Sequence, residues 1–233
     1  MYFNSFPSTF YSLDNRASVQ IVTNIFLRSV FTDELKNNFS VFNEYDIVDG
    51  ETPEITAFKI YGNSELHWIL LHLNDIIDPR YDWVLSQQQL KTYVETLYGS
   101  INAIHHYEDS DGNTIQANVI LNSPSFTSFE PGDVLYNQSF NGLGYVTSKI
   151  SNTQIIATVT QGGIQSGNQI SNNIMGTNKA NVTSTTIITG TAITNIMYEE
   201  NKNEEKRRIR VLKPEFVQKI INEFQSKMND INE

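Results

Sequence analysis

The chain has 233 residues, of which 39% are hydrophobic and 11% aromatic, so it has enough apolar material for one large domain or two ordinary ones. Its formal net charge of −10 argues against a nucleic-acid-binding surface, which would need a basic face to neutralise phosphates. The chain has no cysteine, which excludes disulfides and thiolate chemistry, and no apolar run approaches the roughly eighteen residues of a membrane-spanning helix.

Residues 1–44 are expected to form an aromatic N-terminal arm and a helical lead-in, and they lack the basic and apolar regions of a secretory signal. Five aromatic residues lie near the start of the chain, in a stretch too short for a core of its own: Tyr2, Phe3, Phe6, Phe10 and Tyr11. Because chain termini fray unless something holds them, we expect these side chains to contact a partner protein. The alternative is that they fold back on their own domain.

Residues 45–48 alternate like a short strand and lead into a turn. Residues 52–54 (Thr-Pro-Glu) are typical of a helix start, with a capping hydroxyl, a proline in the first turn and an acid near the positive end of the helix dipole. We expect this helix to turn Ile55 and Phe58 inward and to end at Gly62.

A second helix is predicted to begin near Asn63, and because it is apolar nearly all round it should be buried. A third helix begins with the capping box formed by Ser86 and Gln89, and we expect it to bury Leu90, Tyr93, Val94 and Leu97. The expected core of this region consists of Phe58, Leu66, Trp68, Ile69, Leu70 and Trp83.

Charged residues are almost absent from the middle of the chain. Between residues 115 and 195 there are only Glu130, Asp133, Lys149 and Lys179, whereas the rest of the chain holds 38 of the 42 charged residues. We therefore expect residues 115–198 to form an inserted all-β module whose ends lie close together. Its predicted strands, separated by Gly, Asn and Ser turns, are 134–136, 144–150, 154–160, 169–174 and 185–189. Residues 107–114, just before it, are typical of a hairpin tip.

The last segment, residues 199–233, is charged again and is expected to return to the main domain. Residues 201–206 are predicted to form a loop and residues 208–212 a strand. A helix from Pro214 onward carries an apolar stripe of Phe216, Val217, Ile220, Ile221, Phe224 and Met228. An isolated helix of this length is marginal in water, so the stripe must pack against something. The stripe can pack against a partner protein, through Phe216, Ile220 and Phe224, or against the chain's own domain.

The histidines do not form a metal-binding pattern. His67 and His72 are five residues apart, about 140° around a helix, whereas a zinc-binding helix places its ligands at i and i+4. His105 and His106 should point to opposite faces of a strand, so joint metal binding is not expected.

The acidic clusters have structural explanations. The run from Asp109 to Asn113 is similar to a calcium loop, but its glycine stands at the wrong position, so a hairpin turn is expected. Asp75, Asp78 and Asp82 could supply the carboxylate pair of a hydrolase, but a helix end and a turn explain them better. We therefore predict no catalytic, cofactor-binding or metal-binding residues.

Two resemblances give these elements a family context. Tyr45-x-Ile47-Val48-x-Gly50-x-Thr52-Pro53-Glu54, followed by Tyr61-Gly62-Asn63 and Leu73-Asn74-Asp75, is similar to the lysin motif, a small βααβ module known for binding N-acetylglucosamine polymers. The run from Ile60 to Asp75, continued by Asp78-Pro79, Tyr81, Trp83 and Ser86-Gln87, resembles the small baseplate wedge subunit of contractile-tailed bacteriophages. This second resemblance covers about residues 1–114 and 200–230, and leaves the middle stretch unexplained.

These resemblances imply a lysin-motif-like βααβ core at residues 45–114 and a closing strand and amphipathic helix, and together with the inserted all-β module expected from the composition they give an α+β fold. They imply a non-enzymatic structural subunit of a phage tail baseplate wedge, located in the virion and assembled in the host bacterial cytoplasm. Its expected partners are other wedge proteins, neighbouring wedges and the central hub, with no nucleic acid, membrane or cofactor. The alternative is a glycan-binding module of a cell-wall-degrading tail protein, which would expose aromatic side chains beside a sugar groove.

Overall fold

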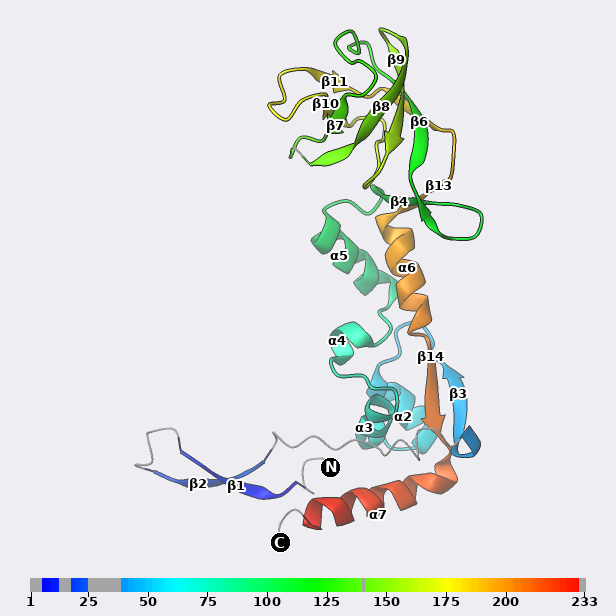
Figure 1. Ribbon diagram of the computed structural model, residues 1–233. Helices are drawn as coiled ribbons and strands as arrows, with labels where there is room; N and C mark the ends of the chain where they lie inside the picture. The colour runs from blue at the N-terminus through cyan, green and yellow to red at the C-terminus, as the bar shows by residue number, and fades with distance from the viewer. Residues whose placement is uncertain (1–5, 13–17, 25–38, 140, 231–233) are drawn as a thin grey trace. The chain divides into compact units, whose positions relative to one another are not determined.

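The computed structural model describes residues 6–12, 18–24, 39–139 and 141–230. The chain contains two compact units: unit 1 comprises residues 1–89 and 202–233, and unit 2 comprises residues 90–201 (Figure 1). Helices and strands are mixed, in agreement with the predicted α+β class. Unit 2 is larger than the predicted insertion at residues 115–198, because a helix and a small sheet on its flanks belong to it. Among the described residues, no helix is long and apolar enough to cross a membrane.

The centre of unit 1 is a pair of antiparallel strands from distant parts of the chain. β3 (Phe42–Asp46) pairs with β14 (Arg208–Leu212), and Figure 1 shows the two strands side by side. Ile209 and Val211 are buried, as the alternation of the predicted strand requires. The C-terminal part of the chain thus returns to unit 1.

Helix α2 (Pro53–Tyr61) begins and ends where the sequence predicts. The Thr52 hydroxyl accepts a hydrogen bond from the Ile55 N–H, which caps the first turn. At the other end Gly62 has a φ of 71°, a left-handed conformation that favours glycine.

The orientation of α2 differs from the prediction. Ile55 and Phe58 are exposed, and the residues that α2 buries are Pro53, Thr56 and Ala57. Ala57 is completely buried in a cluster that includes Ile47, Leu70, Trp83 and Val84. The helix therefore packs through its small residues, and this close approach leaves the larger side chains outside.

The second predicted helix consists of a 3-10 turn, η3 (Ser64–Leu66), and the α-helix α3 (His67–Leu73). As predicted, α3 is buried on most sides, through Trp68, Ile69, Leu70 and Leu73. A short helix, α4 (Pro79–Asp82), follows.

The predicted capping box begins α5 (Gln87–Tyr98), where Ser86 and Gln89 are hydrogen-bonded to each other. Leu97 is exposed, contrary to the prediction. Leu90 and Val94, four residues apart, are buried as predicted, and Tyr93 and Tyr98 are half-buried.

The C-terminal helix α7 (Pro214–Asp230) buries its predicted stripe within unit 1. Its side chains share one cluster with residues of the N-terminal segment, of the 3-10 turn η2 (Phe39–Val41), and of β3, α3 and β14: Phe6, Val41, Phe42, Trp68, Ile69, Leu73, Leu212, Val217, Ile220, Phe224 and Met228. The structure thus supports the alternative that this helix folds back on its own domain.

The segment predicted as a loop at residues 201–206 is mostly helical, because it continues α6 (Asn195–Glu205). The Asn203 side chain explains the difference: its amide group donates to the Leu85 carbonyl at 2.9 Å and accepts from the Leu85 N–H at 2.8 Å. Tertiary contacts therefore stabilise a helix that the polar sequence itself does not favour. The unit boundary falls within α5 and α6.

Unit 2 contains a three-stranded sheet in which β4 (Ile104–Glu108) lies between β5 (Thr114–Ile115) and β13 (Thr191–Thr194). The two ends of the uncharged stretch therefore belong to one small sheet, as predicted. Residues 107–114 form the expected hairpin turn, in which the Asp109 carboxylate accepts from the Asp111 and Asn113 N–H groups.

The rest of unit 2 is an antiparallel seven-stranded sheet in the order β11-β10-β7-β8-β9-β6-β12. Its strands are β6 (Ala117–Asn122), β7 (Val134–Tyr136), β8 (Gly142–Ser151), β9 (Gln154–Val159), β10 (Gln169–Ser171), β11 (Lys179–Asn181) and β12 (Ser184–Ile187). The outer strands β11 and β12 follow each other directly in the chain, so one bent segment pairs with β10 at one end and with β6 at the other. This arrangement leaves little unpaired sheet edge. The sequence did not predict β6, β11 or β13.

Candidate interaction surface

The eight predicted partner-contact residues do not form one surface. Tyr2 and Phe3 lie outside the described residues. Phe6, Ile220 and Phe224 are buried in unit 1, and Phe216 packs against the same cluster. Phe10 and Tyr11 are on the surface, with exposed fractions of 77% and 47%.

Three aromatic rings explain why part of this set is buried. The Phe224 ring lies 4.8 Å from the Trp68 ring and 6.0 Å from the Phe6 ring, measured between centroids. These distances are typical of favourable aromatic pairs. Phe6 and Phe224 thus tie the N-terminal segment and α7 to α3 in the core of unit 1.

Phe10 belongs to a two-stranded hairpin formed by β1 (Ser8–Tyr11) and β2 (Gln20–Thr23). It stands directly opposite Ile21, which is 71% exposed, so the two side chains form an apolar pair on one face of the hairpin. Neither strand contains a charged residue. An isolated hairpin is marginally stable in water, and an uncharged edge is a template for pairing, so this element is suited to contact another protein.

The outer face of α2 is a second exposed apolar surface, which the sequence analysis missed. Ile55 and Phe58 are 45% and 62% exposed and lie three residues apart on the helix. The signal that could have revealed it is the presence of apolar side chains on both sides of this helix, since only one side can face the core.

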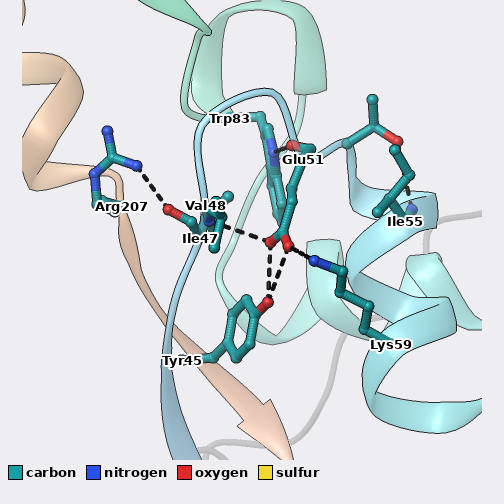
Figure 2. A network of polar contacts seen from close by, with 9 residues as sticks. Tyr45, Ile47, Val48, Glu51, Ile55, Lys59, Trp83 and Arg207 are labelled. Atoms are coloured by element: carbon teal, nitrogen blue, oxygen red, sulfur yellow. Dashed lines mark hydrogen bonds and ion pairs between the residues drawn. The ribbon is translucent and has the colours of Figure 1, made fainter.

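A buried carboxylate fixes the loop between β3 and α2. Figure 2 shows the Glu51 side chain between Tyr45, Val48 and Lys59. The Tyr45 hydroxyl donates to it at 2.9 Å and the Val48 N–H at 3.2 Å, and the Lys59 ammonium group forms an ion pair with it.

Two further contacts hold the backbone of this loop (Figure 2). The Trp83 indole N–H donates to the Glu51 carbonyl at 2.7 Å, and the Arg207 guanidinium donates to the Ile47 carbonyl at 2.7 Å. The loop is therefore bound both to the segment after α4 and to the start of β14.

Burial opposes ionisation of Glu51, but the hydrogen bonds from Lys59, Val48 and Tyr45 outweigh it and hold the pKa of this carboxyl below its usual range. A carboxyl whose pKa is lower in the folded state than in the unfolded state stabilises the fold at pH values above its ordinary pKa. This contribution is lost as the pH falls through the lowered pKa.

We therefore predict that Glu51→Gln lowers the free energy of unfolding of unit 1 by about 1–3 kcal/mol at neutral pH, since it weakens hydrogen bonds to a charged group. The ion pair adds little to this effect, because the Lys59 side chain is 52% exposed and water screens its charge. Both tryptophans lie in unit 1, so denaturation followed by tryptophan fluorescence measures the effect. The difference from the wild type should shrink as the pH falls below about 4.5, and an undiminished difference there would contradict the assignment.

A groove of about 320 Å³ lies beside this loop. Its lining comes from the loop, from α4 and from the start of α5, and includes Pro53, Pro79, Arg80, Trp83 and Gln88. Trp83 is the aromatic side chain among the described residues that line this groove. It is only 4% exposed, and its N–H is bonded to the Glu51 carbonyl. Trp68 is 6% exposed. Neither tryptophan presents a ring to a sugar.

Two carboxylates of the acidic cluster, Asp78 and Asp82, serve local structure. Asp78 caps α4 and binds Arg80 through both carboxylate oxygens, and the hydrogen bonds from Arg80 lower the pKa of Asp78. The Asp82 carboxylate accepts from the Ile77 and Asp78 N–H groups. His67 and His72 each contact a carbonyl of their own helical segment. Within the described ranges, no group of three or more His, Cys, Asp or Glu residues could hold a metal ion.

Comparison with known families places the chain among the baseplate wedge proteins of phages. The model of the family "Base plate wedge protein 53" matches residues 1–159, which is more than half of the chain, and the chain belongs to this family. The resemblance inferred from residues 60–87 is thereby confirmed.

A curated relative supports this assignment. Baseplate wedge protein gp53 of Enterobacteria phage T4 is 37% identical over 82 residues, which cover 35% of this chain. The chain spans little more than a third (37%) of the length of that relative.

Proposed function

We propose that this protein is a non-enzymatic structural subunit of the tail baseplate that links wedge components and neighbouring wedges during tail assembly. The observation that carries the proposal is membership of the baseplate wedge family across residues 1–159. In this proposal the partners are other wedge proteins, neighbouring wedges and the central hub. The protein is assembled in the host cytoplasm and remains in the virion.

Peptide mass spectrometry of purified tails tests this function. The chain should be found in intact tails, and tails from a mutant phage that lacks the gene should have incomplete baseplates. Recovery of the chain only from the unassembled fraction of the lysate would contradict the proposal.

The exposed hairpin is the proposed contact surface. Phe10 and Ile21 offer an uncharged apolar pair, and Tyr11 lies next to it on the same strand. Apolar and aromatic side chains that a partner can desolvate contribute most of the binding energy in protein interfaces. Removal of Met1–Tyr11 would also take away buried Phe6, so point substitutions in the hairpin are a sharper test than deletion.

We predict that the double variant Phe10→Ser/Ile21→Ser keeps the melting temperature of the wild type but does not complete baseplates. Exposed positions usually change stability by no more than about 0.5 kcal/mol. Complementation of a phage lacking the gene, followed by electron microscopy of tails, measures the effect. The matched control is Val48→Ser, which alters another exposed apolar residue of unit 1. Normal tails from the hairpin variant would exclude this surface.

The lysin-motif-like core is part of the same proposal. β3, α2, α3 and β14 follow the order strand, helix, helix, strand, and the two strands are paired, which supports this interpretation. The second strand of this arrangement, β14, lies outside the predicted range of residues 45–114 and is separated from the helices in sequence by unit 2. A fold of this type does not require sugar binding.

The glycan-binding alternative is weakened by the burial of both tryptophans. We also predict no hydrolysis of cell walls, because Asp78 is engaged in an ion pair with Arg80 and Asp82 accepts from two backbone N–H groups. Zymography of the isolated protein on bacterial cell walls should stay blank. A cleared band that disappears in Asp75→Asn would contradict the non-enzymatic assignment.

A further inference from the structure

Two consecutive histidines of β4, His105 and His106, meet side by side in unit 2. Their Nδ1 atoms are 2.8 Å apart, and their ring centroids are 5.0 Å apart. The prediction that they point to opposite faces is wrong, and the reason is an irregularity in the strand. Ile193 of β13 pairs with His106 and the next residue pairs with Ile104, so His105 is an extra residue in the ladder. Such a bulge re-aims a side chain.

The hydrogen bonds of this pair restrict where its protons can be. His106 Nε2 lies 2.8 Å from the Glu108 carboxylate, which only accepts, so this nitrogen carries a proton. When His106 is neutral, its Nδ1 accepts and His105 Nδ1 donates. When His106 is charged, the roles are reversed. In both states a single proton lies between the two Nδ1 atoms.

Helices α5 and α6 supply the other groups around the pair. Tyr198 of α6 stacks on the His105 ring at 3.9 Å, and its edge meets His106 at 5.5 Å. Tyr98 of α5 approaches His105 at 5.7 Å and donates to the Glu199 carboxylate at 2.8 Å. Burial and this bond to Glu199 raise the pKa of Tyr98, so it stays neutral wherever histidine titrates.

The titratable groups around the pair are thus Glu108 on β4, Tyr98 and its neighbour Tyr93 on α5, and Tyr198 and Glu199 on α6. The paired strands β5 and β13 consist of Thr, Ile and Ala and add none.

We propose that His105 and His106 act as a proton-limited switch: the pair keeps its contact while it carries at most one extra proton, and a second proton breaks the contact and loosens β4 from α6. The reason is geometric. Two charged imidazoles would both present an N–H at Nδ1, two donors cannot hydrogen-bond, and like charges at this distance repel. Acidification supplies the second proton, so unit 2 responds to a fall in pH.

The test is a pH titration of the full-length protein by NMR of its imidazole nitrogens. The chain has only four histidines, and His67 and His72 in unit 1 serve as internal references. His105 and His106 should take up protons in two separate steps, because the second proton has to break the contact between them. His106→Asn should move the titration midpoint of His105, whereas His72→Asn should not. If both histidines take up their protons over the same pH range, and neither titration changes when the other histidine is replaced, the proposal is overturned.

Hydrogen exchange of the same protein tests the mechanical consequence. The protection factors of the backbone amides of β4 and α6, which compare the observed rate with the intrinsic rate at each pH, should begin to fall over the pH range of the second protonation step. In His106→Asn the amide oxygen can still accept from His105 Nδ1–H and cannot be protonated, so no second proton breaks the contact and this onset should disappear. An unchanged onset in that variant would overturn the switch. Where the variant does not fold, the wild-type titration decides alone.

Discussion

Trp68→Ala should lower the free energy of unfolding of unit 1 by about 3–5 kcal/mol. The indole is 6% exposed and contacts the Phe224 ring, so its removal leaves a large cavity between α3 and α7. Trp83 remains in the same unit as a fluorescence probe for chemical denaturation.

The matched control is Phe58→Ala on the neighbouring helix α2. This ring is 62% exposed, so its loss should change stability by no more than about 0.5 kcal/mol. If Trp68→Ala keeps its melting temperature but the wild type binds chitin oligomers and the variant does not, Trp68 is a sugar platform and the glycan alternative is correct.

Phe224→Ala should have an effect of similar size, about 3–5 kcal/mol, because this ring joins α7 to both Trp68 and Phe6. Its loss should also weaken the attachment of the N-terminal segment. Denaturation followed by tryptophan fluorescence measures the first effect, and limited proteolysis near the chain ends measures the second.

The control on the same helix is Lys219→Ala, which replaces an exposed residue of α7 and should be nearly neutral. A Phe224→Ala variant with unchanged stability that fails to enter baseplates would show that α7 is a partner surface, as the other sequence interpretation proposed.

Local signals in the sequence predicted the helices that begin or end at a characteristic capping residue, and the strand in which buried residues alternate. Thr52 and Gly62 delimit α2, Ser86 starts α5, and the alternation at Ile209 and Val211 marks β14. Each of these signals acts within a few residues of itself, so a single sequence is sufficient to recognise it.

Features that depend on distant parts of the chain were not predictable in this way. α2 turns Ala57 inward because of the elements it packs against, and α6 is a helix because Asn203 finds its partner at Leu85. The histidine pair depends on a bulge that becomes visible only when β13 is paired with β4. Periodicity gives the faces of an element but not which face is covered.

The candidate surface shows the same limit. The sequence indicated an aromatic arm, but it could not separate Phe6, which is held by Phe224, from Phe10, which stands on an exposed hairpin. Both are aromatic residues without periodic context, and only the packing of α7 distinguishes them.

The central proposal, that the N-terminal hairpin joins this wedge protein to a neighbour in the baseplate, is tested most directly by site-specific photocross-linking. Phe10 is replaced by p-benzoylphenylalanine, which keeps an aromatic ring at an exposed position. Assembled tails are then irradiated and the products identified by mass spectrometry. We predict a cross-link from position 10 to a different protein of the baseplate. Cross-links confined to the chain itself, in tails that assemble normally, would contradict the proposal.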